Sequence, residues 1–402
     1  MATVAQSGER VGIPTREQLL DRARKLAPVL KERAAEAEAA RNLQAETIQD
    51  FQEAGFFRVL QPRRWGGYEM EPSDFFDIQM ALAEGDMSAA WVYGVVGCHP
   101  YELALFHDQA QADVWGEDDS VLVSSSYQPV GKVERIDGGF RLSGRWGFSS
   151  GSLHCQWVLL GALIPPAAEG QPPEMRTFLV PRTDYVIEDT WDVFGLKATG
   201  SNDIVVDGAF VPDYRTHKAT DGFLCANPGQ LENDGPLYRL PWAQVFTRSV
   251  STAALGATRG ALSAFIEIAK SRVSTNTGKA SKADPLAMAA AAKAAAQVDE
   301  MVTTLHRNFA TLLGYAQLAE PMPADLRLFY RYQSTTVVRR CADLVNEMMP
   351  LLGGRAIYNH SPIVRYWLDL NAGRAHVAND PSFAAPDLFM NLMGEEPTPG
   401  FY

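Results

Sequence analysis

The sequence of 402 residues is poor in cysteine and has no long hydrophobic run. Its four cysteines stand apart, without a C-x-x-C pair, at Cys98, Cys155, Cys225 and Cys341. This spacing argues against a zinc ribbon or a disulfide framework and predicts reduced, mostly buried thiols. No stretch of about eighteen apolar residues occurs, and the N-terminus lacks the charged-then-apolar pattern of a secretory signal. We therefore expect a cytoplasmic protein that does not enter a membrane.

Basic residues are also scarce, with 36 Lys and Arg against 48 Asp and Glu and a formal net charge of −12. A phosphate backbone would be repelled, so nucleic acid is not an expected partner. Neither G-x-G-x-x-G nor G-x-x-x-x-G-K-[ST] occurs, which leaves a Rossmann or P-loop nucleotide site without support. The seven histidines are scattered, without H-E-x-x-H spacing, and no metal site is expected.

The pattern of apolar residues divides the chain into three parts. A Thr15-x-x-Gln18 capping box opens a helix that reaches about residue 40, and further helices are predicted over 46–54, 72–84, 88–106 and 108–115. Between about 121 and 212, short alternating runs broken by Gly, Pro and Asp indicate antiparallel strands. Helical spacing returns at 249–271, 284–315, 324–351 and 363–378. The sequence thus predicts an α+β fold: helices in 1–120, a β-barrel or sandwich in 121–235, and a four-helix bundle in 236–402.

The most informative stretch reads GRWGFSSG, at 144–151. Trp146 and Phe148 lie two apart and would share one face of a strand, beside hydroxyls on the other face. A flat aromatic wall next to serines suits a flavin ring, although an edge strand with surface serines gives the same pattern. A second segment, DTWDVFGLKATGSNDIVVDGAFVP at 189–212, sharpens this interpretation because its turn has the same polar, glycine-rich character.

Together the two segments resemble the central β-domain of the acyl-CoA dehydrogenase superfamily, whose G-x-R/K-x-T/S-G-S signature is similar to residues 195–201. The resemblance spans about 17–380. It is closest to the two-component flavin-dependent aromatic hydroxylases, including those that act on phenolic A-ring secosteroids. The segments LQPRRWGG (60–67), ALFHDQAQADVWGED (104–118), SSSYQP (124–129) and GRAHVANDP (373–381) carry this closer likeness.

The resemblance implies an acyl-CoA dehydrogenase-like fold and the oxygenase component of a monooxygenase. Reduced flavin, FMNH2 or FADH2, would come from a separate NAD(P)H-dependent flavin reductase and react with O2 to give a C4a-hydroperoxide. The distal oxygen would then pass to the ortho position of a small aromatic substrate, a phenol, for which the closest members suggest a polycyclic one. A homotetramer is implied in the same way.

The resemblance also implies roles for individual residues. His376 matches the base that removes the phenol proton, for which an ordinary imidazole pKa near 6.5 is suitable. His99 matches a second histidine that hydrogen-bonds the phenol oxygen or the hydroperoxide. The flavin would meet an aromatic wall and hydroxyls that bond N5 or O4, with Ser150 also counted as catalytic, and glycines of a neighbouring subunit would approach its phosphates. The cofactor residues so implied are Trp146, Phe148, Ser149, Ser150, Ser124, Ser125, Ser126, Gly353 and Gly354.

Several alternatives stay open at this point. By spacing alone, Arg365 and Asp369 form a surface ion pair on a helix that continues to a solvated His376, and His99 is a core residue. The glycine pair alone is equally typical of a helix C-cap. The segment AGRAHVAND lacks the glutamate that dehydrogenases of the superfamily use, so an acyl-CoA dehydrogenase would need Asp369 or Asp380 as base. N- or S-oxygenation by the same flavin chemistry, and a catalytically silent scaffold, are the other rivals.

Overall fold

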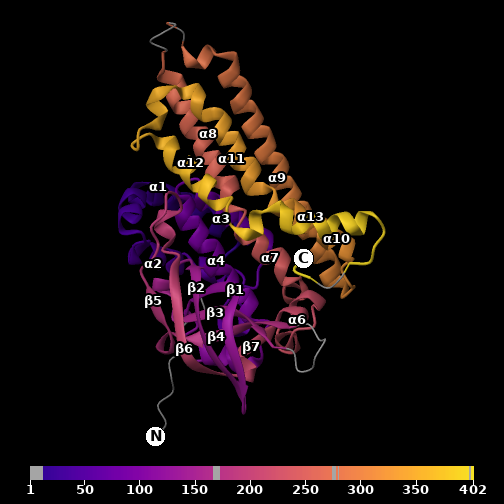
Figure 1. The fold of residues 1–402 in the computed structure, drawn as a ribbon. Coiled ribbons are helices and arrows are strands. Elements are labelled where there is room, and N and C mark those ends of the chain that lie inside the picture. Colours follow the sequence, from indigo (N-terminus) through magenta and orange to yellow (C-terminus); the bar gives the residue numbers. More distant parts are fainter. Residues whose placement is uncertain (1–11, 166–172, 274–277, 279, 398–399) are drawn as a thin grey trace.

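The computed structural model describes residues 12–165, 173–273, 278, 280–397 and 400–402. Five helices open the fold, all of them predicted from the sequence: α1 (Arg16–Ala40), α2 (Ala45–Glu53), α3 (Pro72–Ala83), α4 (Met87–Leu103) and α5 (Asp108–Trp115). The predicted capping box is confirmed, because Thr15 Oγ accepts from the Gln18 amide and the Gln18 side chain accepts from the Thr15 amide. These helices lie between the sheet and the long C-terminal helices (Figure 1).

The middle of the chain forms one seven-stranded sheet in the order β5-β6-β2-β1-β3-β4-β7. The strands are β1 (Val123–Ile136), β2 (Gly139–Ser149), β3 (Trp157–Ile164), β4 (Glu174–Pro181), β5 (Val186–Glu188), β6 (Asn202–Pro212) and β7 (Thr216–Lys218). The expected antiparallel arrangement is wrong for one pair, since β1 and β3 run parallel. The reason is topological: after β2 the chain turns back and passes to the other edge of β1, so that β3 runs in the direction of β1.

The C-terminal part is helical: α6 (Ala219–Leu224), α7 (Trp242–Ser249), α8 (Ala253–Ser271), α9 (Pro285–Leu318), α10 (Ala324–Thr335), α11 (Val337–Met348), α12 (Pro362–Gly373) and α13 (Pro381–Leu392). Helices α8, α9, α11 and α12 pack together, which confirms the bundle. Two predicted helices are corrected. The segment 324–351 is broken into α10 and α11 at Thr336, and the helix expected to reach residue 378 ends at Gly373, where a Cβ would meet the Met87 side chain at 3.2 Å.

One hydrophobic core joins the two helical parts, as the Phe76 ring of α3 and the Phe309 ring of α9 illustrate with centroids 5.1 Å apart. The sheet has a core of its own around Phe140, Trp146 and Phe178. All four cysteines are free, as expected, and three of them are buried. No helix within the described ranges is long and apolar enough to cross a membrane. Helices α4 and α7 approach β1, as the rings of Tyr127 and Phe246 show with centroids 5.0 Å apart, and the candidate site lies there.

Candidate functional site

The C-terminal end of β2 departs from the regular strand predicted for it. The pairing with β6 shifts between Trp146 and Ser149, and Phe148 has a φ of 65°, which is rare for a side chain of its size. Phe148 is therefore 64% exposed, with its ring near that of Trp191, whereas Trp146 is fully buried. The Trp146 indole donates to the carbonyls of Gly161 and Gln128 inside the sheet. The prediction that these two rings form one flavin wall is wrong for Trp146.

The two sequence segments that pointed to a flavin meet in the structure. The amide of Gly151 donates to the Thr199 carbonyl over 2.8 Å. The Ser150 and Ser201 hydroxyls lie 2.7 Å apart, and the Thr199 hydroxyl lies 2.6 Å from that of Ser201. These contacts hold the turn at 195–201 against the end of β2. The turn is also tied to the bundle, because the Leu196 amide donates to Asp369 Oδ1 over 2.6 Å.

Hydroxyl groups without partners collect on the strand ends. The Oγ atoms of Ser149 and Ser152 are buried and bond to no other described residue, whereas Ser124 interacts with the Cys155 thiol and Ser126 Oγ donates to the Gly147 carbonyl. A buried hydroxyl left unpaired costs about 1–3 kcal/mol, which a ligand with polar edges would recover. Alternation along β1 places Ser125 on the opposite face from Ser124 and Ser126. The exposed Phe148 ring and the unpaired serines fit a flat, polar-rimmed cofactor such as a flavin.

One face of α4 forms the other side of the site. Trp91, His99 and Glu102 recur at helical spacing on this face. The ring of His99 lies 6.3 Å from that of Tyr127 on β1, and the Tyr127 hydroxyl donates a short hydrogen bond to Glu102. Tyr127 in turn packs edge-on against Phe246 of α7, with centroids 5.0 Å apart. We call Trp91, Tyr127, Trp242 and Phe246 the aromatic cluster; Trp242 joins it through Phe246.

His376 joins this cluster from the C-terminal part of the chain. Its ring lies 5.7 Å from Trp91 and 6.4 Å from Phe246. It caps the short 3-10 turn Val377–Asn379, and its Nδ1 accepts from the Ala378 amide over 3.1 Å. Because α12 ends earlier, His376 does not continue its face as the spacing suggested.

The expected ion pair between Arg365 and Asp369 is also wrong. Arg365 pairs with Glu38 at 3.1 Å, whereas Asp369 is buried beneath Leu196. Burial raises the pKa of Asp369 well above its ordinary value. Asp380 caps α13 by accepting from the Ser382 amide. Both carboxyls that a dehydrogenase would need as bases are therefore engaged in holding the fold.

The imidazole of His99 is buried and that of His376 is half-buried, and the two present opposite hydrogen-bonding ends. The carbonyl of Val123 can only accept, so His99 Nδ1 donates to it over 2.5 Å and Nε2 carries the lone pair. This Nε2 is buried and bonds to no other described residue. In His376 the main-chain amide can only donate, so Nδ1 carries the lone pair and the neutral ring has its hydrogen on Nε2. The site thus offers an acceptor from His99 and a donor from His376.

Burial also sets the charge state of the site. It lowers the pKa of His99 to about 4, although the bond to Val123 opposes the shift. It lowers the pKa of His376 to about 4 as well, with a further contribution from the positive charge of Arg331. Burial raises the pKa of Glu102 to about 8, against hydrogen bonds from Tyr127 and Thr177. At neutral pH both imidazoles are therefore neutral and Glu102 is mostly protonated.

The glycine pair lies apart from these residues in the single chain. Gly353 ends a 3-10 turn after α11 with a φ of 67°, and a Cβ there would meet the Arg272 guanidinium at 2.3 Å. Gly354 has open space where a side chain would be. Four other histidines have structural partners, as the sequence predicts for them: His107 caps α5, His217 bonds Asn227, His306 bonds Asp77 and His360 stacks on Tyr358.

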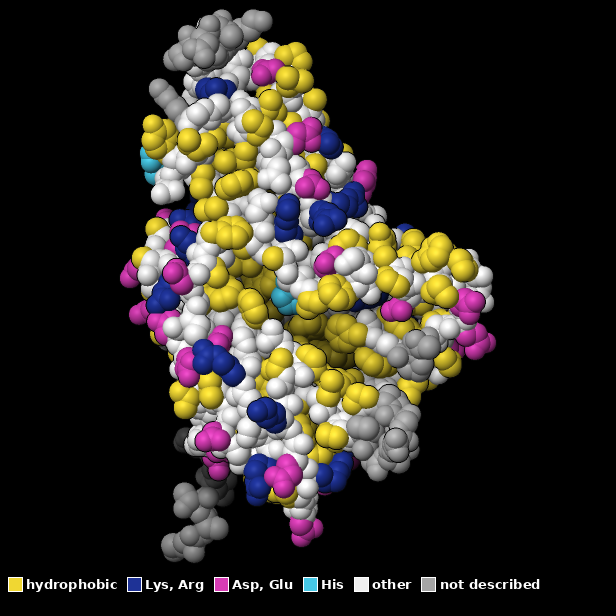
Figure 2. All heavy atoms as spheres, viewed as in Figure 1, with side chains coloured by type: hydrophobic (Ala, Val, Ile, Leu, Met, Phe, Trp, Pro, Cys, Tyr) yellow, Lys and Arg dark blue, Asp and Glu magenta, His cyan; other side chains and the backbone are white. Residues whose placement is uncertain are grey.

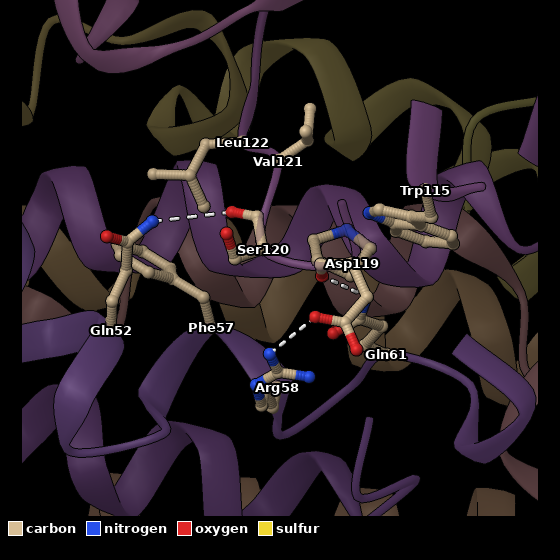
Figure 3. A pocket seen from close by; sticks show the side chains of 10 residues that line it. Gln52, Phe57, Arg58, Gln61, Trp115, Asp119, Ser120, Val121 and Leu122 are labelled. Atoms are coloured by element: carbon tan, nitrogen blue, oxygen red, sulfur yellow. Dashed lines mark hydrogen bonds and ion pairs between the residues drawn. The ribbon is translucent and has the colours of Figure 1, made fainter. Parts of the chain in front are cut away.

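The surface is hollowed beside α7 and β1. Figure 2 shows this hollow lined largely by hydrophobic side chains, with a histidine at its edge. A separate pocket of about 50 Å³ lies between α2, α4 and α5 (Figure 3) and is crossed by the ion pair of Arg58 with Asp119. None of the residues predicted for the site lines this second pocket. Its volume is also far too small for a flavin ring.

Sequence reasoning missed most of the aromatic cluster and Glu102. Tyr127 lies in the motif SSSYQP, but the residues around it in the sequence do not indicate that its hydroxyl bonds Glu102. The helical spacing of Trp91, His99 and Glu102 was the one available signal. Phe246 contributes only through tertiary packing.

Models of protein families match both ends of the chain. The acyl-CoA dehydrogenase N-terminal domain matches residues 14–116, and the acyl-CoA dehydrogenase C-terminal domain matches residues 249–381. The oxygenase subunit HsaA of a flavin-dependent monooxygenase from Rhodococcus jostii is 38% identical over 89% of this chain and 94% of its own length. The chain belongs to the acyl-CoA dehydrogenase superfamily, in its flavin-dependent monooxygenase branch.

Other relatives place it in the same branch. The oxygenase component of an FADH2-dependent resorcinol hydroxylase from Rhizobium is 31% identical over 94% of this chain and 95% of its own length. The crystal structure of the 3-HSA hydroxylase from Rhodococcus superimposes with a TM-score of 0.91, at 36% identity, over 96% of this chain and 99% of that one. The fold inferred from the sequence is therefore confirmed, and the branch is that of flavin- and O2-dependent oxygenase components.

Proposed function

We propose that this monooxygenase hydroxylates a phenol at the ortho position, using reduced flavin delivered by a separate NAD(P)H-dependent flavin reductase. The observation that carries the proposal is the pair of neutral imidazoles, one accepting and one donating, at the aromatic cluster. A phenol oxygen has one proton to give and lone pairs to receive a bond, so it matches the two histidines together. An acyl-CoA thioester has no such group.

The strand ends are proposed to hold the flavin. Phe148 would pack on the ring, and the unpaired Ser149, together with Ser124 and with Ser150 in its hydroxyl chain, would bond its polar rim. When bound, reduced flavin activates O2 so that one oxygen atom can be transferred to the substrate. Gly353 and Gly354 are proposed to approach the flavin phosphates of a neighbouring subunit in a homotetramer, since the single chain leaves them apart from the serines.

The helix side is proposed to prepare the phenol. The proton of the phenol O–H passes to the lone pair of His99 Nε2, so that the O–H bond breaks and an N–H bond forms without any change of oxidation state. The phenolate oxygen then carries the charge and makes the ortho carbon electron-rich. A phenol has a pKa near 10 and the pKa of His99 is low, so this transfer needs a second group that stabilises the phenolate. In this proposal His376 Nε2–H is that group.

The aromatic cluster has a further proposed role in excluding water. Tyr127, Trp242 and Phe246 surround the approach to His99, and neutral Glu102 fixes the Tyr127 ring by hydrogen bonding. A dry site keeps the reaction with O2 from ending in free peroxide. The hydrophobic hollow in Figure 2 favours an extended or polycyclic phenol, and FAD is the favoured cofactor because the resorcinol hydroxylase is FADH2-dependent. The free cysteines and the need for a reductase favour a cytoplasmic location.

A stoichiometric assay tests the function. Purified protein is supplied enzymatically with FMNH2 or FADH2, O2 and a panel of single-ring and polycyclic phenols, and hydroxylated product and released peroxide are both quantified. We expect one phenol class to give product equal to the flavin consumed. Peroxide alone, with every phenol unchanged, would contradict the proposal. The same assay with amines, thiophenes and acyl-CoA thioesters then distinguishes N-oxygenation, S-oxygenation and acyl-CoA dehydrogenation.

A further inference from the structure

The turn that carries His376 is fixed from two directions. The amide of Ala378 donates to His376 Nδ1, and the carbonyl of the same residue, which belongs to the next peptide unit, accepts from Arg331 Nη1 over 3.1 Å. Asn379, the next residue, donates from its side chain to the carbonyls of Gly373 and Val250 over 3.0 Å each. The two peptide units that flank the Ala378 Cα therefore cannot rotate without breaking several hydrogen bonds, because the Val377 carbonyl accepts from the Asp380 amide and the Asn379 amide donates to the His376 carbonyl.

Arg331 is an unusual residue to find in this position. It projects from α10 and is only 7% exposed, and it also bonds the Ser334 hydroxyl. No ion pair with a carboxylate is formed by Arg331 within the described ranges, so its charge is balanced only by neutral oxygens. A buried guanidinium is costly to keep when its partners are neutral, and a role in the turn would explain it.

The surroundings of His376 support a fixed, neutral ring. Trp91 of α4 and Phe246 of α7 face it with aromatic rings, and Arg331 of α10 faces it with a positive charge. A second buried cation, Arg248 of α7, lies close enough to Arg331 to lower its own pKa, so the field behind the turn is positive. Gain of a proton by His376 is opposed both by burial and by this field.

We propose that Arg331 is a positioning residue that, through Ala378, holds His376 in the tautomer with hydrogen on Nε2. His376 then donates a hydrogen bond to the phenolate oxygen and is not the group that takes the phenol proton. The sequence had suggested the opposite role for His376. The consequence for catalysis rests on the proposed function, whereas the tautomer itself does not.

The tautomer can be measured in the protein without flavin or substrate. In protein labelled with ¹⁵N-histidine, two-bond couplings between ring nitrogens and ring protons distinguish the two neutral tautomers, and His376→Asn identifies the signals. We expect His376 to be the Nε2–H form and to stay neutral from pH 8 to pH 5.5. A ring with hydrogen mainly on Nδ1, or one that gains a proton near pH 6.5, overturns the proposal whatever the variants do.

The role of Arg331 is tested by substitution. Arg331→Met removes the bond to Ala378 and the charge, and should shift the tautomer ratio about tenfold, the effect of one lost hydrogen bond of ordinary strength. It should also raise the pH at which His376 gains a proton. Arg331→Lys, which keeps a donor and the charge, should restore most of the wild-type ratio. An Arg331→Met ring that matches wild type in ratio and titration contradicts the role.

A neighbouring arginine supplies the matched control. Arg327 lies on the same helix, is 8% exposed and bonds the carbonyls of Phe223 and Tyr402 instead of the turn. Arg327→Met should destabilise the protein without changing the His376 tautomer. With a phenol substrate, Arg331→Met should lower the product formed per flavin about tenfold, with a changed pH profile. If no phenol is hydroxylated but the tautomer is as expected, the proposed function fails and the tautomer stands.

Discussion

The two sides of the site hold their polar groups in different ways. On the strand side, Ser149 and Ser150 are neighbours in sequence, and the turn at 195–201 adds the Ser201 hydroxyl, which contacts that of Ser150 directly. On the helix side, His99 and His376 come from opposite ends of the chain and meet only through packed aromatic rings. The residues of the strand side thus lie in short sequence motifs, whereas those of the helix side are far apart in sequence and come together only through tertiary packing. Substitutions on the two sides should accordingly separate cofactor binding from substrate activation.

The largest effect should come from substitution of Trp146. Comparing it with Phe148 distinguishes a residue of the sheet core from a residue that contacts the flavin. Trp146→Ala should lower the free energy of unfolding by about 3–5 kcal/mol, because a fully buried ring and its two hydrogen bonds are lost. Phe148→Gly should cost little stability, because glycine adopts the positive φ without strain, yet weaken flavin binding. Denaturant titrations and flavin binding measured on both variants check this. Equal stability losses would refute the distinction.

His99→Gln should abolish substrate activation while sparing the cofactor side. We expect hydroxylation to fall about 100-fold, at the lower end of what a general base contributes, while flavin is still oxidised and peroxide is released. Product and peroxide are measured together. His154→Gln is the matched control, because His154 also has a buried Nε2 without a partner among the described residues but no contact with the aromatic cluster. A normal product yield in His99→Gln would remove His99 from the reaction.

How much of this arrangement the sequence predicts depends on the range of the contacts. GRWGFSSG and the glycine-rich turn identified the strand side because their residues act through local backbone geometry. The same motif misled on Trp146, since alternation along a strand gives no warning of a bulge. For His376, helical spacing failed because Gly373 and Pro381 end and restart the helices around it. Glu102 is indicated only by its helical spacing from Trp91 and His99, and Phe246 is revealed only by tertiary packing.

Ser149→Ala should act on the strand side with a signature that a structural serine cannot give. Removing an unpaired buried hydroxyl should leave the flavin-free protein as stable or slightly more stable, while reduced flavin binds about tenfold more weakly. Ser126→Ala loses a bond to the Gly147 carbonyl, so it should lower the stability of the flavin-free protein and leave the flavin affinity unchanged. Anaerobic flavin titrations and thermal melts of both variants give the comparison. Unchanged flavin affinity in Ser149→Ala would exclude this hydroxyl from the cofactor site.

Glu102 should give the stability of the protein a pH dependence. Its pKa is raised from 4.5 to about 8 in the folded protein, so between these values the folded state keeps a proton that the unfolded state releases. Stability therefore falls as pH rises through this window, by about 1 kcal/mol per pH unit from this group. The side chain of Glu102→Gln is neutral throughout, so the free energy of unfolding of this variant should rise relative to that of wild type between pH 6 and pH 8. A difference that does not vary with pH would mean that Glu102 is ionised in the fold.

A crystal structure of the protein with flavin and a bound phenol tests the division of the site most directly. The account predicts the flavin ring against Phe148 with its polar rim at Ser149 and Ser150, and the phenol oxygen within hydrogen-bonding distance of both His99 Nε2 and His376 Nε2. A phenol bound away from the two histidines, or a flavin that leaves the strand ends uncovered, would contradict it.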